Sequence, residues 1–174
     1  MKNICAWCKT ELKTDNPNPD QGISHGMCSA CAKRMFSSFS VPLTDFLDRL
    51  DVPILLFEPE PRVRTANKKA RELLQKDLGQ IEGRRGGEVI DCTYSASPQG
   101  CGSHLHCVSC TIRNTVLETF ATGRAFYRVP AYPDIQMIDE VKTFSMLIST
   151  EKVGDFVMLR IDELRDEEEA LQRA

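Results

Sequence analysis

Hydrophobic residues recur along this chain in two patterns, which predict strands in some segments and helices in others. Short apolar runs bounded by turn residues, such as Val52-Pro-Ile-Leu-Leu-Phe57 before Glu58-Pro-Glu-Pro61, predict buried strands. The pattern recurs three times after position 123, with residues 151–155 as a hairpin loop. The five expected strands cover residues 52–57, 62–65, 124–132, 141–150 and 156–162.

Helical spacing of apolar residues predicts helices between the second and third strands and before the first. The clearest covers 111–122, where apolar side chains share one face and Gly123 stands in the position of a C-terminal cap. Another is expected over 66–76, and Thr44 suits the N-cap of a short helix, whereas 79–87 is expected to be a glycine-rich connector. The residues of the second helix expected to face inward are Ala70, Leu73 and Leu74. This order predicts an α+β fold, an antiparallel sheet with helices on one face.

The two ends of the chain differ from this central part. Residues 1–40 have too few large apolar residues to bury a core, although a helix is expected over 29–39, before a linker at 40–42. The end of the chain is charged and helix-forming, and its apolar spacing predicts a short coiled-coil helix that pairs two copies of the chain. The expected parts are a module over 1–40, a domain over 44–162 and a signalling or dimerisation helix over 163–174.

Composition narrows the class of protein. The chain has 174 residues, of which 41% are hydrophobic and 27% charged, as in soluble globular proteins. Its net charge of −3 gives no general attraction to nucleic acid, and no apolar run is long enough to span a membrane. The N-terminus has no signal-peptide pattern, so we expect a cytoplasmic protein whose thiols are kept reduced.

The first four cysteines form a regular pattern. Two C-x2-C turns, Cys5-Ala-Trp-Cys8 and Cys28-Ser-Ala-Cys31, stand nineteen residues apart. Such a pair of turns can place four thiolates around one zinc ion, and the ion would supply folding energy that this small module lacks. Two disulfides or a redox-active pair are the alternatives, and His25 is expected to be a surface or outer-shell residue.

The other four cysteines, Cys92, Cys101, Cys107 and Cys110, are irregularly spaced. Because Cys110 comes directly before the predicted helix 111–122, its thiolate would be stabilised there, and Gly100 and Gly102 would let the backbone wrap closely around an ion or a cluster. Zinc and iron–sulfur both accept four thiolates, and spacing does not choose between them. The histidines that could replace a cysteine ligand are His104 and His106. Other readings are a Cys101–Cys107 or Cys107–Cys110 disulfide, and Cys92 as a small buried residue ending a strand or turn at 88–91.

The order of these elements resembles a PAS domain, the sensory fold of bacterial histidine kinases and related regulators. The resemblance covers about Thr44 to Asp162: 52–57 looks like the first strand, Arg62-Val-Arg-Thr-Ala-Asn67 like the second with its helix-opening Asn, and 111–122 like the long helix. It implies a PAS-like five-stranded sheet. The cysteine-rich segment 100–113 also looks like a cysteine-rich PAS subgroup, and the N-terminal module resembles a zinc ribbon.

The resemblance implies a cytoplasmic protein of signal transduction that senses redox state, oxygen or a small ligand through its second cysteine group. Such a protein would act by association, as a homodimer or with a histidine kinase or other signalling protein. We expect no enzymatic activity, because no Ser-His-Asp array or phosphate-binding loop is present. Two alternatives stay open. One is a zinc-dependent nucleic-acid-binding regulator with a basic face around Arg84-Arg85 and Lys68-Lys69-Ala-Arg71; the other is a thiol oxidoreductase that uses Cys107 and Cys110.

Overall fold

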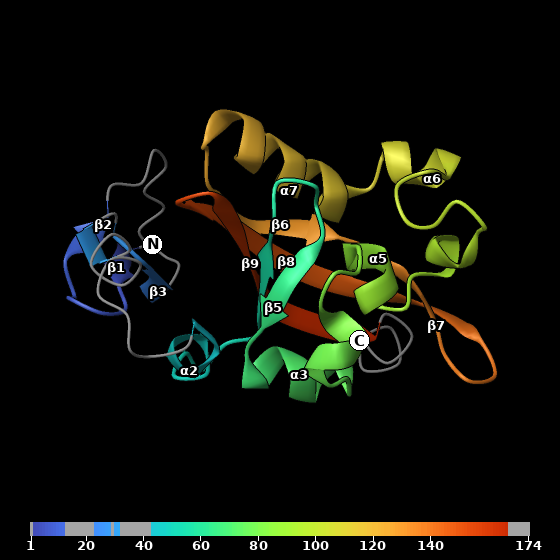
Figure 1. Ribbon diagram of the computed structural model, residues 1–174, viewed down its shortest axis with the longest axis horizontal. Coiled ribbons are helices and arrows are strands. Elements are labelled where there is room, and N and C mark those ends of the chain that lie inside the picture. The colour runs from blue at the N-terminus through green and yellow to red at the C-terminus, as the bar shows by residue number, and fades with distance from the viewer. Residues whose placement is uncertain (1, 13–22, 29, 32–42, 167–174) are drawn as a thin grey trace, which may run out of the picture. The chain divides into compact units, whose positions relative to one another are not determined.

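The computed structural model of the chain describes residues 2–12, 23–28, 30–31 and 43–166 (Figure 1). The chain divides into two compact units, Met1–Pro42 and Leu43–Ala174. Most of the helix predicted over 29–39, and the linker at 40–42, lie outside the described residues; Ala30 and Cys31 are helical. None of the helices in the described part combines the length and apolarity needed to cross a bilayer.

The first unit contains a small three-stranded sheet, which was not predicted. Its strands are β1 (Lys2–Cys5), β2 (Glu11–Leu12) and β3 (Ile23–Gly26), in the order β2-β1-β3. β1 pairs antiparallel with β2 and parallel with β3, so Cys5 lies opposite Gly26. This parallel register places the start of the first cysteine turn, Cys5, close to the start of the second, Cys28.

The second unit is built on an antiparallel sheet in which β5-β4-β9-β8-β6 is the order of neighbours, and β7 pairs with β8 off this path. The five predicted strands are all present. β7 is a sixth, which was not predicted: it pairs with β8 beyond Pro133, whose carbonyl accepts a hydrogen bond from Phe144 N of β8 at 3.0 Å. The strands are β4 (Ile54–Phe57), β5 (Val63–Ala66), β6 (Phe126–Ala131), β7 (Asp134–Gln136), β8 (Val141–Val153) and β9 (Phe156–Asp166).

The helices lie mainly between β5 and β6. α7 has the predicted bounds, and Gly123 closes it at a φ of 73°. The connector predicted at 79–87 is partly helical, Thr44 lies inside α2 rather than at its N-cap, and Leu73 is 38% exposed rather than inward-facing. The helices are α2 (Leu43–Leu47), α3 (Lys68–Leu74), α4 (Leu78–Ile81), α5 (Gly86–Val89), the short 3-10 helix η1 (Thr93–Ala96), α6 (Leu105–Val108) and α7 (Thr111–Thr122).

The core of the second unit lies between the sheet and the helices that follow β5. α7 runs along β6, β8 and β9 (Figure 1), and its buried Thr119 shares a 2.7 Å hydrogen bond with Thr150 of β8. The pattern of alternate inward-facing residues places Val157, Leu159 and Ile161 of β9 in this core. The predicted apolar face of α7 is therefore the face that packs on the sheet.

The predicted start of the C-terminal helix at residue 163 is wrong. β9 continues through Glu163–Asp166, where Phe144 of β8 pairs with Asp166 and Lys142 Nζ lies 3.0 Å from the Asp166 carboxylate. The register shifts between Leu147 and Ile148, which absorbs one extra residue of β9 in a bulge. Residues 167–174 lie outside the described residues, so the coiled coil stays a prediction.

One buried amide joins the start of the sheet to the first helix after it. Asn67 is fully buried and caps α3, where its Oδ1 accepts hydrogen bonds from the N–H groups of Ile54 (2.9 Å) and Ala70 (3.0 Å). Its Nδ2 donates to three backbone carbonyls at 2.7–3.2 Å. These carbonyls belong to Leu47, Leu50 and Val52. Asn67 therefore satisfies buried and partly buried backbone groups of three separate segments.

Replacing Asn67 by alanine should lower the free energy of unfolding by about 2–4 kcal/mol, because it leaves several buried backbone groups without partners. Urea denaturation followed by circular dichroism measures the change. The exposed neighbour Lys68 provides the control, since K68A should change stability by no more than about 0.5 kcal/mol. Equal stabilities of the two variants would contradict this role of Asn67.

Candidate functional site

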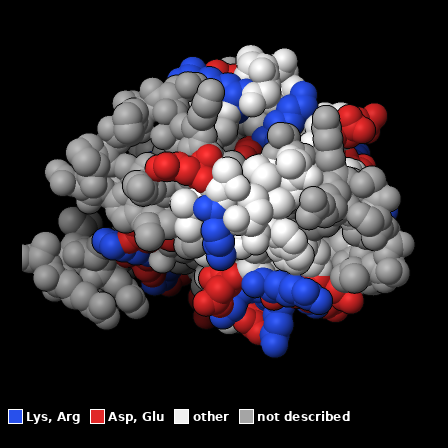
Figure 2. Space-filling view, turned by 90° about the vertical axis from the view of Figure 1, so that its left-hand side faces the viewer, with Lys and Arg blue, Asp and Glu red and all other residues white. Residues whose placement is uncertain are grey.

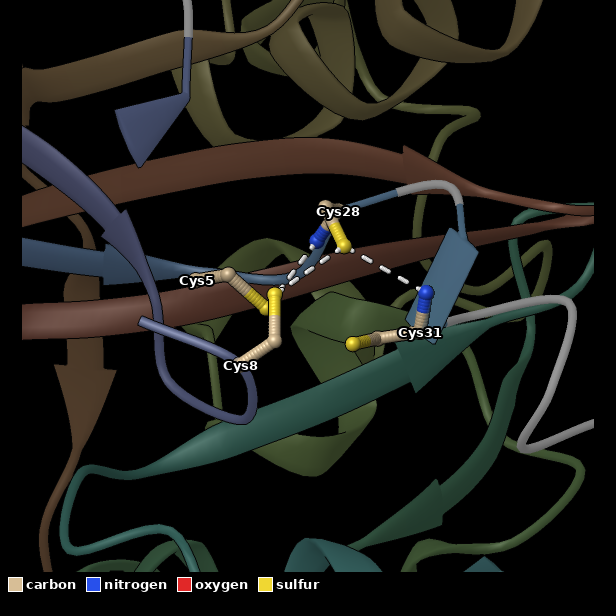
Figure 3. A group of neighbouring side chains, drawn as sticks. All are labelled: Cys5, Cys8, Cys28 and Cys31. Carbon is tan, nitrogen blue, oxygen red and sulfur yellow. Dashed lines mark hydrogen bonds between the residues drawn. The ribbon is translucent and has the colours of Figure 1, made fainter. Parts of the chain in front are cut away.

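The four cysteines of the first unit converge as predicted. The sulfur atoms of Cys5, Cys8, Cys28 and Cys31 all lie within 4.8 Å of one another, and Figure 3 shows them turned toward a common centre. Backbone N–H groups also point at the sulfurs: Cys28 N donates to Cys5 Sγ at 3.4 Å and Cys31 N to Cys28 Sγ at 3.3 Å. Four thiols in this arrangement could hold one metal ion.

The thiols of this cluster differ in acidity. A 3.1 Å hydrogen bond between Cys8 and the Thr10 hydroxyl is the main cause that lowers the pKa of Cys8 to about 6. Burial, followed by hydrogen bonds with the neighbouring sulfurs, raises the pKa of Cys31 to about 12. Cys8 is therefore an exposed thiolate at neutral pH, while Cys31 must lose a proton when a metal binds.

The second group of cysteines surrounds a cavity of about 540 Å³ in the second unit, and all four cysteines line it. Cys92 precedes η1, Cys101 lies in a loop, Cys107 is buried in α6, and Cys110 is the N-cap of α7, as its place before that helix predicted. The strand or turn predicted before Cys92 is instead helix α5 followed by a turn. Segments spread over twenty residues therefore bring four thiols to one space.

The backbone approaches these sulfurs closely. A Cβ added to Gly87 would lie 2.7 Å from Cys101 Sγ, and the Gly87 N–H is hydrogen-bonded to that sulfur. Gly102 N donates to Cys107 Sγ at 3.3 Å. Gly100 and Gly102 have φ values of 73° and 98°, so the loop wraps as the two glycines predicted.

The two groups differ in the spacing of their sulfurs. The first is the one set of three or more Cys, His, Asp or Glu side chains, among the described residues, whose ligand atoms all lie within 4.8 Å of one another. The cysteines of the second group instead line the cavity. Burial raises the pKa of both Cys92 and Cys101, so these thiols are protonated at neutral pH when nothing is bound.

The sequence missed several polar side chains that line the same cavity, among them Arg85, Arg113 and Tyr94. Tyr94 stacks on His106 with ring centroids 4.3 Å apart, and His104 stacks on both. Both histidines are exposed, and only His106 lines the cavity. The sequence could not distinguish these two arginines from other basic residues, because they come together only when the chain between α5 and α7 folds.

The structure does not favour a nucleic-acid-binding role for the proposed basic face. Lys69 lies 2.9 Å from Asp51 and Arg71 lies 3.1 Å from Asp48, so carboxylates neutralise these two residues of the proposed basic face. Figure 2 shows Lys and Arg interspersed with Asp and Glu on the face in view, which is unlike a nucleic-acid surface. All eight cysteines are free thiols, and neither predicted disulfide is formed.

Three of the solved structures similar to this chain each have a TM-score below 0.5. No family model and no curated protein matches the sequence. The photoactive yellow protein domain of the sensor histidine kinase Ppr from Rhodospirillum centenum is 15% identical, with 69% of this chain and 92% of that chain covered and a TM-score of 0.46. The LOV protein of Rhodobacter sphaeroides is 16% identical, with 68% of this chain and 62% of that chain covered and a TM-score of 0.47.

The PAS domain of BvgS from Bordetella pertussis is 11% identical, with 75% of this chain and 90% of that chain covered and a TM-score of 0.44. Within the chain itself, the first two strands form a hairpin, the long helix packs on the sheet, and the last three strands close it as the PAS resemblance implied. The second unit has a PAS-like fold.

The affinity of the first cysteine group for zinc should rise with pH. Zinc must displace the proton of Cys31 at neutral pH, and below about pH 6 it must displace that of Cys8 as well. Each displaced proton should weaken binding about tenfold per pH unit on acidification. Competition with a chromophoric chelator between pH 5.5 and 8 measures this, and an affinity that does not change with pH would contradict it.

Replacing Gly87 by alanine should destabilise the second unit by about 1–3 kcal/mol, because the added methyl group would overlap Cys101 Sγ and force α5 or the cysteine loop to move. Gly79 in α4 gives a matched control, since it is exposed and its added Cβ would meet only the Asp77 side chain, at 3.4 Å. G79A should be neutral or slightly stabilising in the same urea titration. A stable G87A protein would show that Cys101 is not held against α5.

Proposed function

We propose that this chain is a cytoplasmic sensory protein whose PAS-like unit holds an iron–sulfur cluster on Cys92, Cys101, Cys107 and Cys110. The observation that carries the proposal is that these four thiols line one cavity. A cluster there would respond to oxygen or to the redox state of the cell. The first cysteine group would hold zinc and stabilise its own unit.

The spacing of the sulfurs supports a cluster rather than a single ion in the cavity. A tetrahedral zinc ion, with bonds of about 2.3 Å, holds its ligand sulfurs only ~3.8 Å apart. Among the described residues, the four sulfurs of the first group form the one set close enough to hold a single ion, all within 4.8 Å of one another, whereas the second-group cysteines line a cavity of about 540 Å³. A cluster places several irons and sulfides between its ligands, so it requires more widely spaced sulfurs.

The hydrogen bonds to the sulfurs also favour a bound cofactor. Backbone N–H groups of Tyr94 and Gly87 are directed at Cys92 and Cys101, and Gly102 N donates to Cys107. Such bonds stabilise thiolates, and they are among the factors that set the potential of a cluster. These N–H groups would therefore stabilise the thiolate form of Cys92 and Cys101, although burial keeps both thiols protonated when nothing is bound.

The output of such a sensor would be a change in association, either between two copies of the chain through residues 167–174, which follow β9, or with a histidine kinase or another signalling protein. β9 leads from the sheet directly toward this segment. A change at the cavity could therefore alter the pairing of the segment with a partner. No catalytic role is proposed for the chain.

The test is anaerobic reconstitution of the full chain with iron and sulfide. Wild-type protein should bind zinc and also gain a brown chromophore that air bleaches, with iron and sulfide in matching amounts. Cys→Ser variants at the second group should lose the chromophore and keep zinc. The matched variants at Cys5 or Cys8 should keep the chromophore and lose zinc.

Colourless protein with two equivalents of zinc after this treatment would refute the iron–sulfur proposal. A chromophore that survives replacement of both Cys107 and Cys110 would refute the assignment of its ligands. Metal analysis and the visible spectrum of the same samples separate these outcomes.

A further inference from the structure

Two arginine side chains face the cysteine cavity close to Cys101. Both Arg85 and Arg113 line the cavity. A Cβ added to Gly102 would lie 3.4 Å from Arg113 Nε and 3.7 Å from Arg85 Nη1, so both guanidinium groups border the residue that follows Cys101. Arg85 Nη1 also donates a hydrogen bond to the Cys101 carbonyl.

Neither of these arginines is paired with a carboxylate within 4.0 Å among the described residues, although both are partly buried. Arg85 bonds the Cys101 carbonyl and Arg113 bonds the amide oxygen of Asn114. The other arginines of the described part are either in ion pairs or exposed to water. The Glu88 carboxylate accepts a hydrogen bond from the Arg85 backbone N–H at 3.0 Å but forms no ion pair with the Arg85 guanidinium. A partly buried guanidinium without an ion pair is stabilised by an anion, so both side chains favour an anion in the cavity.

The position of Arg113 adds to this cost. It lies in the first turn of α7, which contains no acidic residue, and the positive end of the helix dipole repels a cation there. The acidic residues that line the cavity do not compensate. Asp134 accepts hydrogen bonds from the Tyr94 hydroxyl (3.0 Å) and the Thr143 hydroxyl (2.6 Å), and Glu60 is exposed.

A cofactor bound by the four thiolates would have the negative charge that balances the two arginines. Four thiolates carry four negative charges, and an oxidised iron–sulfur core or a divalent ion returns two positive charges, which leaves a net charge of two minus. The two guanidinium groups supply two plus. We infer that Arg85 and Arg113 are the counter-charges of the four-thiolate cofactor and that Arg113 raises its reduction potential; this rests on the function proposed above.

The effect on potential follows from the sign of the charges. When the cluster takes one electron from a donor, its negative charge grows by one, and a nearby cation stabilises the reduced form more than the oxidised form. Removing that cation should therefore make reduction harder. Arg113 is a positioning and tuning residue here, not a ligand.

The test compares R113Q with R113K and R124Q in the reconstituted full chain. Each protein is titrated anaerobically with dithionite, which is oxidised to sulfite, in the presence of redox mediators while the cluster absorbance is followed. At the wild-type midpoint, R113Q should show a reduced-to-oxidised ratio about tenfold lower, which is a shift of about 59 mV for one electron.

R113K keeps the charge and should stay near wild type. R124Q removes the charge of an exposed arginine that does not line the cavity and should not shift.

The outcomes separate the two proposals. R113Q should fold, because it removes a cation from a helix N-terminus. If R113Q holds a full complement of cluster with the same potential as R124Q, the tuning role is wrong while the cluster stands. If R113Q loses cluster but the remainder keeps the wild-type potential, the role is structural and the tuning role is again wrong. If the wild-type protein takes up no cluster, the proposed function fails and this inference fails with it.

Discussion

The architecture around the cavity depends on the need of buried backbone groups for partners, and the side chain of Asn67 meets that need where β4, β5 and α3 join. α3 then begins in a fixed direction. Just past its end, Lys76 Nζ donates to the carbonyls of Glu88 (3.1 Å) and Val89 (2.8 Å) at the end of α5 and lies 2.7 Å from an Asp91 carboxylate oxygen. A series of local hydrogen bonds thus fixes the backbone immediately before Cys92.

The two cysteine groups show two ways to bring four thiols together. In the first unit, short strands and two C-x2-C turns do so with little help from packing, and the sulfurs nearly touch. In the second unit, the sulfurs are attached to a loop and three different helical segments. The first arrangement could hold one metal ion between its sulfurs, whereas the second is part of a domain with its own core.

Sequence reasoning worked best where one local pattern decides the structure. The bounds of α7 and its Gly123 cap followed from helical spacing, and the hairpins followed from alternating residues and turns. Sequence reasoning failed where pairing with a neighbouring strand determines the secondary structure. The charged residues after Ile161 have high helix propensity, but pairing with the long strand β8 extends β9 through Asp166. Likewise β7 exists because β8 is long enough to pair with the chain beyond Pro133.

For the site, residue type and spacing identified all eight cysteines, and the convergence of the first group was confirmed. The convergence of Arg85 and Arg113 on the cavity could not be predicted, since it requires residues of α5 and α7 to meet across a loop. A site built from regularly spaced residues can therefore be predicted from the sequence. The charged side chains that surround a site cannot, because their positions depend on tertiary structure.

The close approach of Gly87 to Cys101 has an evolutionary consequence. While the sulfur stays at that place, no side chain can occupy position 87, so the two positions are not independent. Among related sequences, loss of the cysteine should release the constraint on position 87, and larger residues should then appear there. The two positions are expected to covary, which would trace the gain or loss of this cavity through a lineage.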